Sequence, residues 1–318
     1  MSGQSNPNAP TLRLGTRGST LARAQSQLII DSLLRQHRPV NIETQIFKTS
    51  GDQIADRPLH ELGGKGLFVR ELEQALLDKK VDLVVHSFKD VPVTMPLVDQ
   101  SNLIITAVPQ REDVHDVLIS TSAKSIADLP PNAKIGTGSL RRKCQLLALR
   151  PDLQIENIRG NIDTRIHKQR DGEFDAIILA LAGLKRANLF DPSTMHPIPL
   201  DDFLPDAGQG ALALQCRRDD SRTQQFLAPL DDPFSRVCVS LERHIVLLLN
   251  GDCFSPIAAL AELIGTGLRL RVAVGRRGGE LPILRGQAQA PLSGASATII
   301  KTVLNQLSDQ NVHSHLHG

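Results

Sequence analysis

The 318-residue chain contains no tyrosine or tryptophan and only nine phenylalanines. Proteins that bind single-stranded nucleic acid stack bases on aromatic side chains, and this composition offers little for such a platform. The formal net charge of +2 is also too small for the broad basic surface that attracts a phosphate backbone. We therefore expect no nucleic-acid partner.

Long apolar runs are also missing. The longest candidate is IVLLL at 245–249, far short of the ~18–20 apolar residues of a membrane-spanning helix. The first ten residues, MSGQSNPNAP, are polar and lack the apolar core of a secretory signal. We expect a cytoplasmic chain that does not bind membranes.

Cysteine is scarce, and its four positions form no CxxC pair or zinc-like spacing, so we expect reduced thiols and no metal site. Three of the cysteines lie in apolar runs typical of buried small residues: Cys144, Cys216 and Cys238. Cys253 differs, because it lies in the loop-like stretch NGDCFSP between two apolar segments. It is either a plain loop cysteine or a reactive, covalently modified thiol.

Arginine in short turns is the most informative feature that is present. Six arginines lie in or beside turns that contain Gly, Ser or Thr: Arg17, Arg141, Arg142, Arg159, Arg165 and Arg186. Three of these turns follow apolar runs typical of buried strands, at 133–136, 155–158 and 176–182. A guanidinium is always charged and presents a fixed fork of donors that suits carboxylate or phosphate. Several forks at strand ends predict a pocket for a small molecule with many negative groups.

Strand-like and helix-like runs alternate through the first two thirds of the chain. The first series is 12–16, 21–36, 42–49, 65–80 and 81–87, and the second is 105–120, 134–139, 140–150, 155–158, a helix from about 163, and 176–182. This rhythm predicts mainly parallel sheets with helices on both faces. Ligands of such sheets bind beyond the carboxyl ends of the strands, where the arginine turns lie.

The last third has a different pattern. After a β-type run at 208–217 come a helix from about 232, an alternating pair at 268–275 and 282–290 that predicts antiparallel strands, and a final helix at 295–307. We predict an α/β protein with two lobes and a smaller α+β domain. The first domain would comprise 1–108 and 209–229, the second 109–208, and the third 230–318, with hinges near 105–114 and 200–208.

The segment GTGSLRRKCQ combines a helix start with two cations. Thr137 or Ser139 can cap the helix, whose amino end attracts anions. Arg141 and Arg142 nevertheless occupy its first turn, where the helix dipole disfavours each cation by roughly 0.3–1 kcal/mol. We expect the apolar face to carry Leu140, Cys144, Leu147 and Ala148. The two arginines are either surface residues paired with nearby acids or part of an anion clamp.

Other segments allow two interpretations when taken singly. RGNIDTR and TRGST are anion-binding turns or ordinary turns, and GGKG at 63–66 lacks the spacing of a phosphate loop and could form a hinge or flap. In HSFKDVP, which follows the buried run VDLVV, His86 most simply satisfies a local hydrogen bond. Lys89 and Asp90 form either a solvated ion pair or a site that binds an anion beside a developing cation.

Taken in order, these segments resemble the porphobilinogen deaminase (hydroxymethylbilane synthase) family. The resemblance spans about 12–300 and includes LRLGTRGSTLA, GGKGLFVRELE, VDLVVHSFKDVP, GTGSLRRKCQL, RGNIDTR, DAIILALAGLKR, LPDAGQGALALQCR and GDCFSP. It implies two lobes similar to type II periplasmic binding proteins and a third domain. It also implies a transferase of tetrapyrrole (haem) biosynthesis, monomeric and cytoplasmic. Such an enzyme condenses four porphobilinogens head to tail with loss of ammonia and releases 1-hydroxymethylbilane by hydrolysis.

The resemblance also implies roles for single residues. Cys253 would carry a dipyrromethane cofactor through a thioether, and Asp90 would be the catalytic carboxylate. The cofactor would be held by Ser87, Lys89, Asp90, Thr137, Ser139, Arg141, Arg142 and Gly160. The acetate and propionate arms of the substrate and of the growing chain would meet Arg17, Ser19, Gln25, Arg159, Arg165 and Arg186.

Two positions depart from the family pattern. Glu61 stands where relatives often have a basic residue, which weakens the case for two cations in the GGKG segment. Asp252 replaces a glycine before Cys253, and a neighbouring carboxylate disfavours the thiolate. Two other classes stay open at this point: a two-lobed module that binds a polyanion without catalysis, and a regulator that keeps only the fold.

Overall fold

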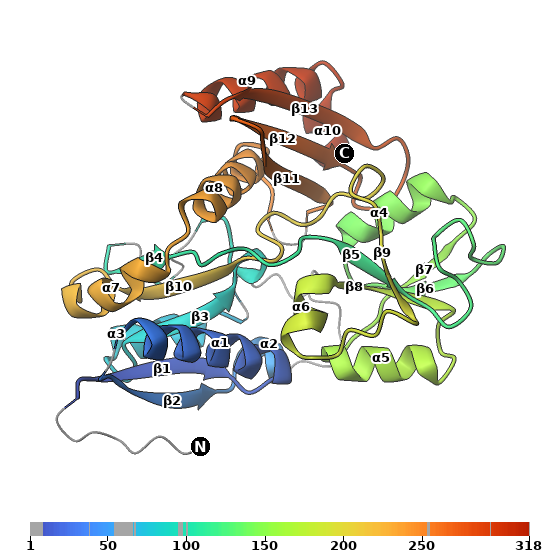
Figure 1. Ribbon diagram of the computed structural model, residues 1–318. Helices are drawn as coiled ribbons and strands as arrows, with labels where there is room; N and C mark the ends of the chain where they lie inside the picture. The colour runs from blue at the N-terminus through green and yellow to red at the C-terminus, as the bar shows by residue number, and fades with distance from the viewer. Residues whose placement is uncertain are drawn as a thin grey trace. The chain divides into compact units, whose positions relative to one another are not determined.

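The computed structural model describes residues 9–37, 39–53, 66, 68–94, 98–99, 101–252, 255–292 and 294–317. The chain divides into two compact units, and their sheets and helices are labelled in Figure 1. Unit 1 comprises 1–55, 64–111 and 211–236, whereas unit 2 comprises 56–63, 112–210 and 237–318. In the described part of the chain, no helix has the length and apolar character needed to cross a bilayer.

Unit 1 is built on one sheet. Its elements are β1 (Thr11–Arg17), α1 (Thr20–Gln36), β2 (Asn41–Phe47), α2 (Ser50–Gln53), α3 (Arg70–Leu77), β3 (Leu83–Ser87), η2 (Phe88–Asp90), β4 (Leu103–Ala107), β10 (Leu212–Arg217), α7 (Ser221–Leu227) and η3 (Ala228–Leu230). The strand order is β2-β1-β3-β10-β4, and of these five described strands only β10 runs against the others. The predicted, mainly parallel α/β sheet is confirmed.

Alternation of side chains along β3 places helices on both faces of this sheet. Leu83 and Val85 belong to a buried cluster with Leu33 of α1. Val84, which lies between them and points the other way, packs with Leu72 of α3. The sheet of unit 1 therefore separates two apolar cores.

The α/β sheet of unit 2 has the same pattern of strand directions, although its reversed strand comes first in the sequence rather than last. Its α/β elements are β5 (Asp116–Ile119), β6 (Lys134–Gly136), α4 (Leu140–Leu149), β7 (Gln154–Glu156), α5 (Ile162–Arg170), β8 (Ala176–Ala180), α6 (Leu181–Arg186) and β9 (Met195–Pro197). The order is β7-β6-β8-β5-β9, and among these five described strands only β5 is reversed. Ile178 packs with Leu146 of α4, and Ile177 packs with Ile166 of α5 on the other face.

A smaller antiparallel sheet follows within unit 2. It contains β11 (Ile257–Ile264), β12 (Gly267–Val274) and β13 (Leu284–Pro291), with the helices α8 (Pro233–Leu248, which begins in unit 1), α9 (Ala295–Ser308) and α10 (Val312–His317). The helix α9 packs so closely that a Cβ at Gly286 would lie 3.1 Å from Val303. The predicted antiparallel pair is confirmed, whereas β11 was not predicted, because its apolar run IAALA shows no alternation.

Two predicted boundaries are wrong for the same physical reason. The helix predicted from 65 begins at Arg70, and the strand predicted from 208 begins at Leu212. Glycines with positive φ precede both elements: Gly66 at 74°, and Gly208 and Gly210 at 76° and 83°. Neither a helix nor a strand continues through that left-handed backbone.

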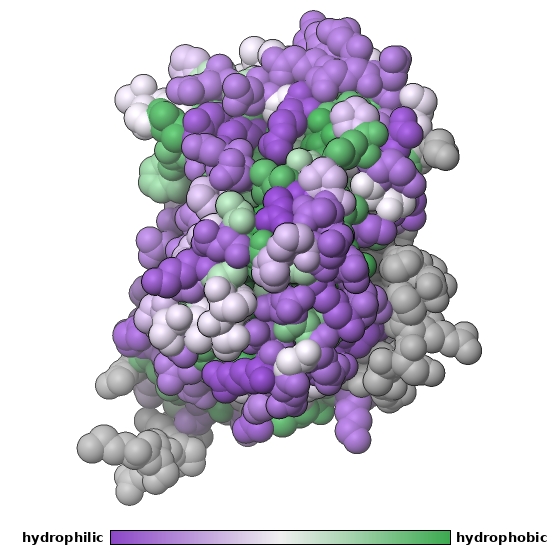
Figure 2. All heavy atoms as spheres, turned by 90° about the vertical axis from the view of Figure 1, so that its right-hand side faces the viewer, coloured by the Kyte–Doolittle hydropathy of each residue, from purple (hydrophilic) through white to green (hydrophobic). Residues whose placement is uncertain are grey.

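The face of the molecule in Figure 2 is mostly hydrophilic, and hydrophobic residues appear on it as patches between polar ones. Large exposed apolar residues come from separate parts of the chain, for example Leu149, Leu263 and Leu281. Exposed apolar residues are common on folded proteins.

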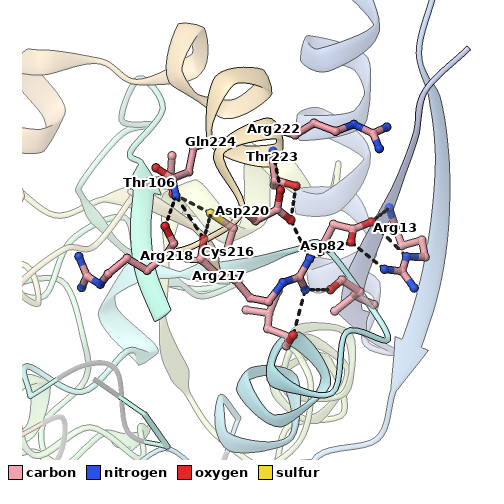
Figure 3. Close-up of polar contacts among 12 residues, drawn as sticks. Arg13, Asp82, Thr106, Cys216, Arg217, Arg218, Asp220, Arg222, Thr223 and Gln224 are labelled. Carbon is pink, nitrogen blue, oxygen red and sulfur yellow. Dashed lines mark hydrogen bonds and ion pairs between the residues drawn. The ribbon is translucent and has the colours of Figure 1, made fainter. Parts of the chain in front are cut away.

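A charged network fastens the amino-terminal edge of the unit 1 sheet (Figure 3). Arg13 of β1 donates from Nη2 to Asp82 Oδ1 at 2.8 Å, and Arg217 of β10 donates to the same oxygen at 3.1 Å. Arg217 also bonds Asp220 at 2.7 Å. Burial alone raises the pKa of the Asp82 carboxyl, but the hydrogen bonds from the two arginines outweigh it and hold the pKa below its usual value.

We predict that Asp82→Asn lowers the free energy of unfolding by about 2 kcal/mol at neutral pH, because two arginines lose their charged acceptor. The folded-state pKa is depressed, so the stabilisation exists above the unfolded carboxyl pKa and is lost as pH falls through the folded value. Urea unfolding over a pH series measures this. The control is Asp78→Asn, which changes an exposed carboxylate that pairs with Lys80 and accepts a hydrogen bond from Gln74. A stability difference that does not change with pH would contradict the assignment.

Candidate functional site

The turn that carries Lys89 and Asp90 lies at the carboxyl edge of the unit 1 sheet. Strand β3 ends at Ser87 and passes directly into η2, which leaves Lys89 and Asp90 half-buried just beyond the strand. Its parallel neighbour β1 ends at Arg17. Because parallel neighbours end at the same edge, Arg17 and Asp90 both belong to this edge.

Helix α1 brings two further predicted residues to this edge. Ser19 caps the helix by accepting a hydrogen bond from the backbone N–H of Ala22 at 3.3 Å. Gln25 is 4% exposed and donates from Nε2 to the hydroxyl of Ser87 at 2.8 Å. This bond fastens α1 to the residue that begins the turn with Lys89 and Asp90.

An aromatic ring orients Arg17. The guanidinium carbon of Arg17 lies 4.0 Å from the centroid of the Phe68 ring, a favourable cation–π geometry. The same ring packs on Gly51 of α2 so closely that no Cβ would fit there. Phe68 was not singled out from the sequence, because one phenylalanine in an apolar segment carries no distinct signal.

His86, one residue before Ser87, is a core residue. It is 5% exposed, and its Nε2 lies 2.9 Å from Oε1 of Gln215. Gln215 in turn donates to the buried Glu73 at 2.8 Å. Burial lowers the pKa of His86 to about 4, so the imidazole is neutral at physiological pH. The expected local hydrogen bond is confirmed.

In unit 2 the predicted residues follow three neighbouring parallel strands. Thr137 and Ser139 follow β6, Arg159 and Gly160 follow β7, and Arg186 ends the helix that follows β8. The carboxyl ends of these strands lie at one edge of the sheet. The predicted location at strand ends is confirmed for the turns after β6 and β7, whereas Arg186 lies at the last position of α6 and not in a turn directly after β8.

Hydroxyl groups organise the start of α4. Ser139 is the N-cap, and its Oγ accepts from the backbone N–H of Arg142 at 3.4 Å. Thr137 is 5% exposed, and its Oγ1 accepts from the backbone N–H of Ser139 at 3.2 Å. The predicted cap is confirmed.

The predicted apolar face of α4 is wrong in part. Cys144 is buried, but Leu140, Leu147 and Ala148 are only half-buried. The core-facing side instead carries Arg141, Arg142, Gln145 and Leu146 together with Cys144. The arginines are 3% and 6% exposed, so they are not surface residues.

One carboxylate accounts for this burial. Asp116, the first residue of β5, pairs through Oδ2 with Arg141 Nη2 at 2.8 Å and through Oδ1 with Arg142 Nη2 at 2.7 Å. Arg141 also donates to the carbonyl of Leu204 at 2.6 Å, and Arg142 donates to that of Ile178 at 2.8 Å. A buried guanidinium requires such partners.

The turn after β7 depends on its glycine. Gly160 has a φ of 113°, and a Cβ at this position would lie 2.8 Å from the side chain of Thr164. Arg165 of α5 donates from Nε to the carbonyl of Gly160 at 2.8 Å. Arg165 and Arg159 are both half-buried, and desolvation lowers the pKa of Arg159 from its ordinary value.

Arg186 is also desolvated. It donates from Nη2 to the carbonyl of Gly210 at 2.7 Å. Burial lowers its pKa to about 10, partly offset by the charge of Glu112. The group stays cationic near neutral pH, which makes it a strong partner for an anion in a dry site.

Two residues named from the sequence, Cys253 and Glu61, lie outside the described residues. Beside Cys253, the carboxylate of Asp252 accepts from the hydroxyl of Ser255 at 2.9 Å, and that hydroxyl accepts from the Asp252 backbone N–H at 2.9 Å. These bonds join the two described residues that flank 253–254 in the sequence.

Sequence reasoning missed Asp116 and Gln209. Gln209 is fully buried and donates from Nε2 to Asp116 Oδ1 at 3.0 Å. A usable signal existed, because a single carboxylate at the start of the apolar run DVLIS needs a cation when it is buried. Its partners are distant in the sequence and could not be chosen from it.

Comparison with known proteins adds a family. The family model described as "Porphobilinogen deaminase, dipyromethane cofactor binding domain" matches residues 12–225. Cys253 lies beyond the matched range. The match covers the described edges of both α/β sheets, including Asp90 and the arginine turns.

Curated relatives match most of the chain. A porphobilinogen deaminase from Roseiflexus sp. (strain RS-1) is 41% identical over 298 residues, which cover 93% of this chain and 96% of the relative. One from Syntrophobacter fumaroxidans is 45% identical over 280 residues, or 88% of this chain and 89% of the relative.

Solved structures match far more distantly. A putative methionine-binding lipoprotein from Bacillus subtilis aligns with 69% of this chain and 89% of its own, at 13% identity and a TM-score of 0.43. That score is too low to support an argument. The family model and the curated relatives are sufficient, and the chain belongs to the porphobilinogen deaminase family.

Proposed function

We propose that this chain catalyses the head-to-tail condensation of four porphobilinogen molecules, with loss of ammonia, and then releases 1-hydroxymethylbilane by hydrolysis. In this proposal it is a transferase of tetrapyrrole biosynthesis. The observation that carries the proposal is the collection of predicted residues at one carboxyl edge of each α/β sheet, within the range that the family model matches.

The donor set suits a carboxylated pyrrole chain. Each porphobilinogen unit carries an acetate and a propionate, and arginine forks bind carboxylates in a fixed geometry. Unit 2 offers Arg159, Arg165 and Arg186 beside its hydroxyl-bearing turn. Arg141 adds a buried Nε that has no hydrogen-bond partner in the described part of the chain. These groups fit a bound dipyrromethane.

When bound, the dipyrromethane would supply the primer to which new pyrroles are joined. In the proposal it is attached to Cys253 by a thioether and held by Ser87, Lys89, Asp90, Thr137, Ser139, Arg141, Arg142 and Gly160. Substrate arms would bind Arg17, Ser19, Gln25, Arg159, Arg165 and Arg186. The cation–π contact with Phe68 and the bond from Gln25 to Ser87 hold parts of the unit 1 edge in place.

Asp90 would carry the proton chemistry. Loss of ammonia from the substrate leaves a pyrrole with positive charge on its nitrogen, which a fixed carboxylate stabilises. The same carboxylate can accept and return a proton at each condensation. Its position in a short 3-10 turn directly after β3 gives the group a rigid support.

The three-domain division, the cytoplasmic location and the monomeric state are parts of the same proposal. A two-lobed polyanion-binding module without catalysis is the competing function. Acid Ehrlich reagent separates them cheaply, because it colours a protein that carries a pyrrole chain and leaves a simple binder colourless.

We predict that Asp90→Asn lowers turnover by about 10³-fold or more, because the pyrrole cation loses its anionic partner and its proton acceptor. The variant should fold and carry its cofactor normally. Steady-state rates and intact mass test this, with the exposed Asp31→Asn of α1 as the control. Normal turnover in Asp90→Asn would reject the catalytic role of this carboxylate.

We also predict that the intact protein is heavier than its sequence by one dipyrromethane, and that Cys253→Ala abolishes the increment. Cys238→Ala, which alters a buried cysteine, should keep it. Mass spectrometry of the three proteins decides the matter. A fully active protein with an unmodified mass would be incompatible with a covalent primer.

A further inference from the structure

Asp116 is the common partner of three buried donors in unit 2. Its side chain is fully buried and meets Arg141, Arg142 and Gln209 at 2.8, 2.7 and 3.0 Å. Two of these donors are arginines that the proposed function assigns to the cofactor. One carboxylate therefore fixes both guanidinium groups at the start of α4.

The charges of this cluster are unbalanced. Two guanidinium groups share one carboxylate, so these three side chains together carry one positive charge in excess. A buried charge is costly unless it is paired, and an incoming carboxylate would balance the cluster. The net positive charge of the cluster is opposite to that of a pyrrole acetate or propionate and would attract it.

The two arginines differ in how many of their nitrogens are engaged. Arg142 uses all three, with Nε and Nη2 on Asp116 and Nη1 on the carbonyl of Ile178. Arg141 uses Nη1 and Nη2, and its buried Nε has no hydrogen-bond partner among the described residues. The Nε–H of Arg141 is thus available to a ligand, whereas the hydrogen bonds of Arg142 fix its guanidinium in place.

Gln209 links Asp116 to the segment 209–210, where the chain passes from unit 2 to unit 1. Besides Asp116 it bonds the carbonyl of Val114 at 2.8 Å. The next residue, Gly210, accepts from Arg186 at 2.7 Å and from the backbone N–H of Glu112 at 3.1 Å. Asp116 and Arg186 therefore contact adjacent residues of the chain, Gln209 and Gly210.

We propose that Asp116 is the positioning residue of the anion-binding edge of unit 2. It anchors Arg142 and holds Arg141 in the orientation that receives a carboxylate of the pyrrole ligand, without touching that ligand itself. This inference rests on the proposed function. It adds a residue outside the predicted set. Loss of its charge would leave two buried guanidinium groups without a carboxylate, so ligand capture and stability have to be measured together.

The test is cofactor loading of cofactor-free full-length protein by added porphobilinogen, followed by intact mass, with Tm measured in parallel. Asp116→Asn should load about tenfold or more slowly than wild type, because misplaced arginines meet the ligand in the wrong geometry. The concentration of porphobilinogen that gives half the maximal rate should rise. Asp152→Asn is the matched control, since it removes a carboxylate of unit 2 that pairs with Arg150 away from this cluster. It should load at the wild-type rate.

Asp116→Glu covers the case in which Asp116→Asn fails to fold. It keeps the charge, so Tm should fall less than in Asp116→Asn, but the added methylene displaces the arginines and should still slow loading. Loading rates that follow Tm along one line for wild type, Asp152→Asn and the Asp116 variants would overturn the positioning role. If wild type itself gains no dipyrromethane mass, the proposed function fails instead.

Discussion

Burial of guanidinium groups is the constraint on which the organisation of unit 2 depends. The dipole at the start of α4 disfavours a cation by roughly 0.3–1 kcal/mol, yet two arginines lie there. Direct pairing with Asp116 at 2.7 and 2.8 Å in a dry environment outweighs a penalty of that size. The helix therefore turns its charged side to the core, and its predicted apolar residues are left half-buried.

The two α/β sheets share one pattern of strand directions. Three neighbouring strands run in parallel beside a reversed strand in each sheet, β2, β1 and β3 beside β10 in unit 1 and β7, β6 and β8 beside β5 in unit 2, so three carboxyl ends lie together. The candidate residues follow these ends. In unit 1 the network around Asp82 fastens the opposite edge (Figure 3), which separates the groups that stabilise the sheet from those proposed to act on the substrate.

Several side chains next to the site serve mainly to place other groups. Gln25 holds Ser87, Phe68 holds Arg17, and Asp116 holds the arginines of α4. Each contact fixes a side chain that the proposed chemistry needs in one orientation. A ligand with many carboxylates binds several arginines. If these side chains are already held in place, less conformational entropy is lost on binding.

Local pattern was sufficient for much of this protein. The alternating runs predicted the α/β class, the turns predicted that arginines follow strands, and the hydroxyl before LRRKCQ predicted the cap at Ser139. The ordered motifs also identified the family. Such features depend on residues within a turn or two of one another, so the sequence by itself determined them.

Only the tertiary structure decided which charges are buried and what they meet. Asp116 is 26 residues from Arg142 and 93 from Gln209, and His86 is 129 from Gln215. The strand β11 likewise became recognisable only through its partner β12. A charge pattern gives the sign of a side chain but not its partner, because the energy of a buried ion depends on groups that the fold brings from distant parts of the chain.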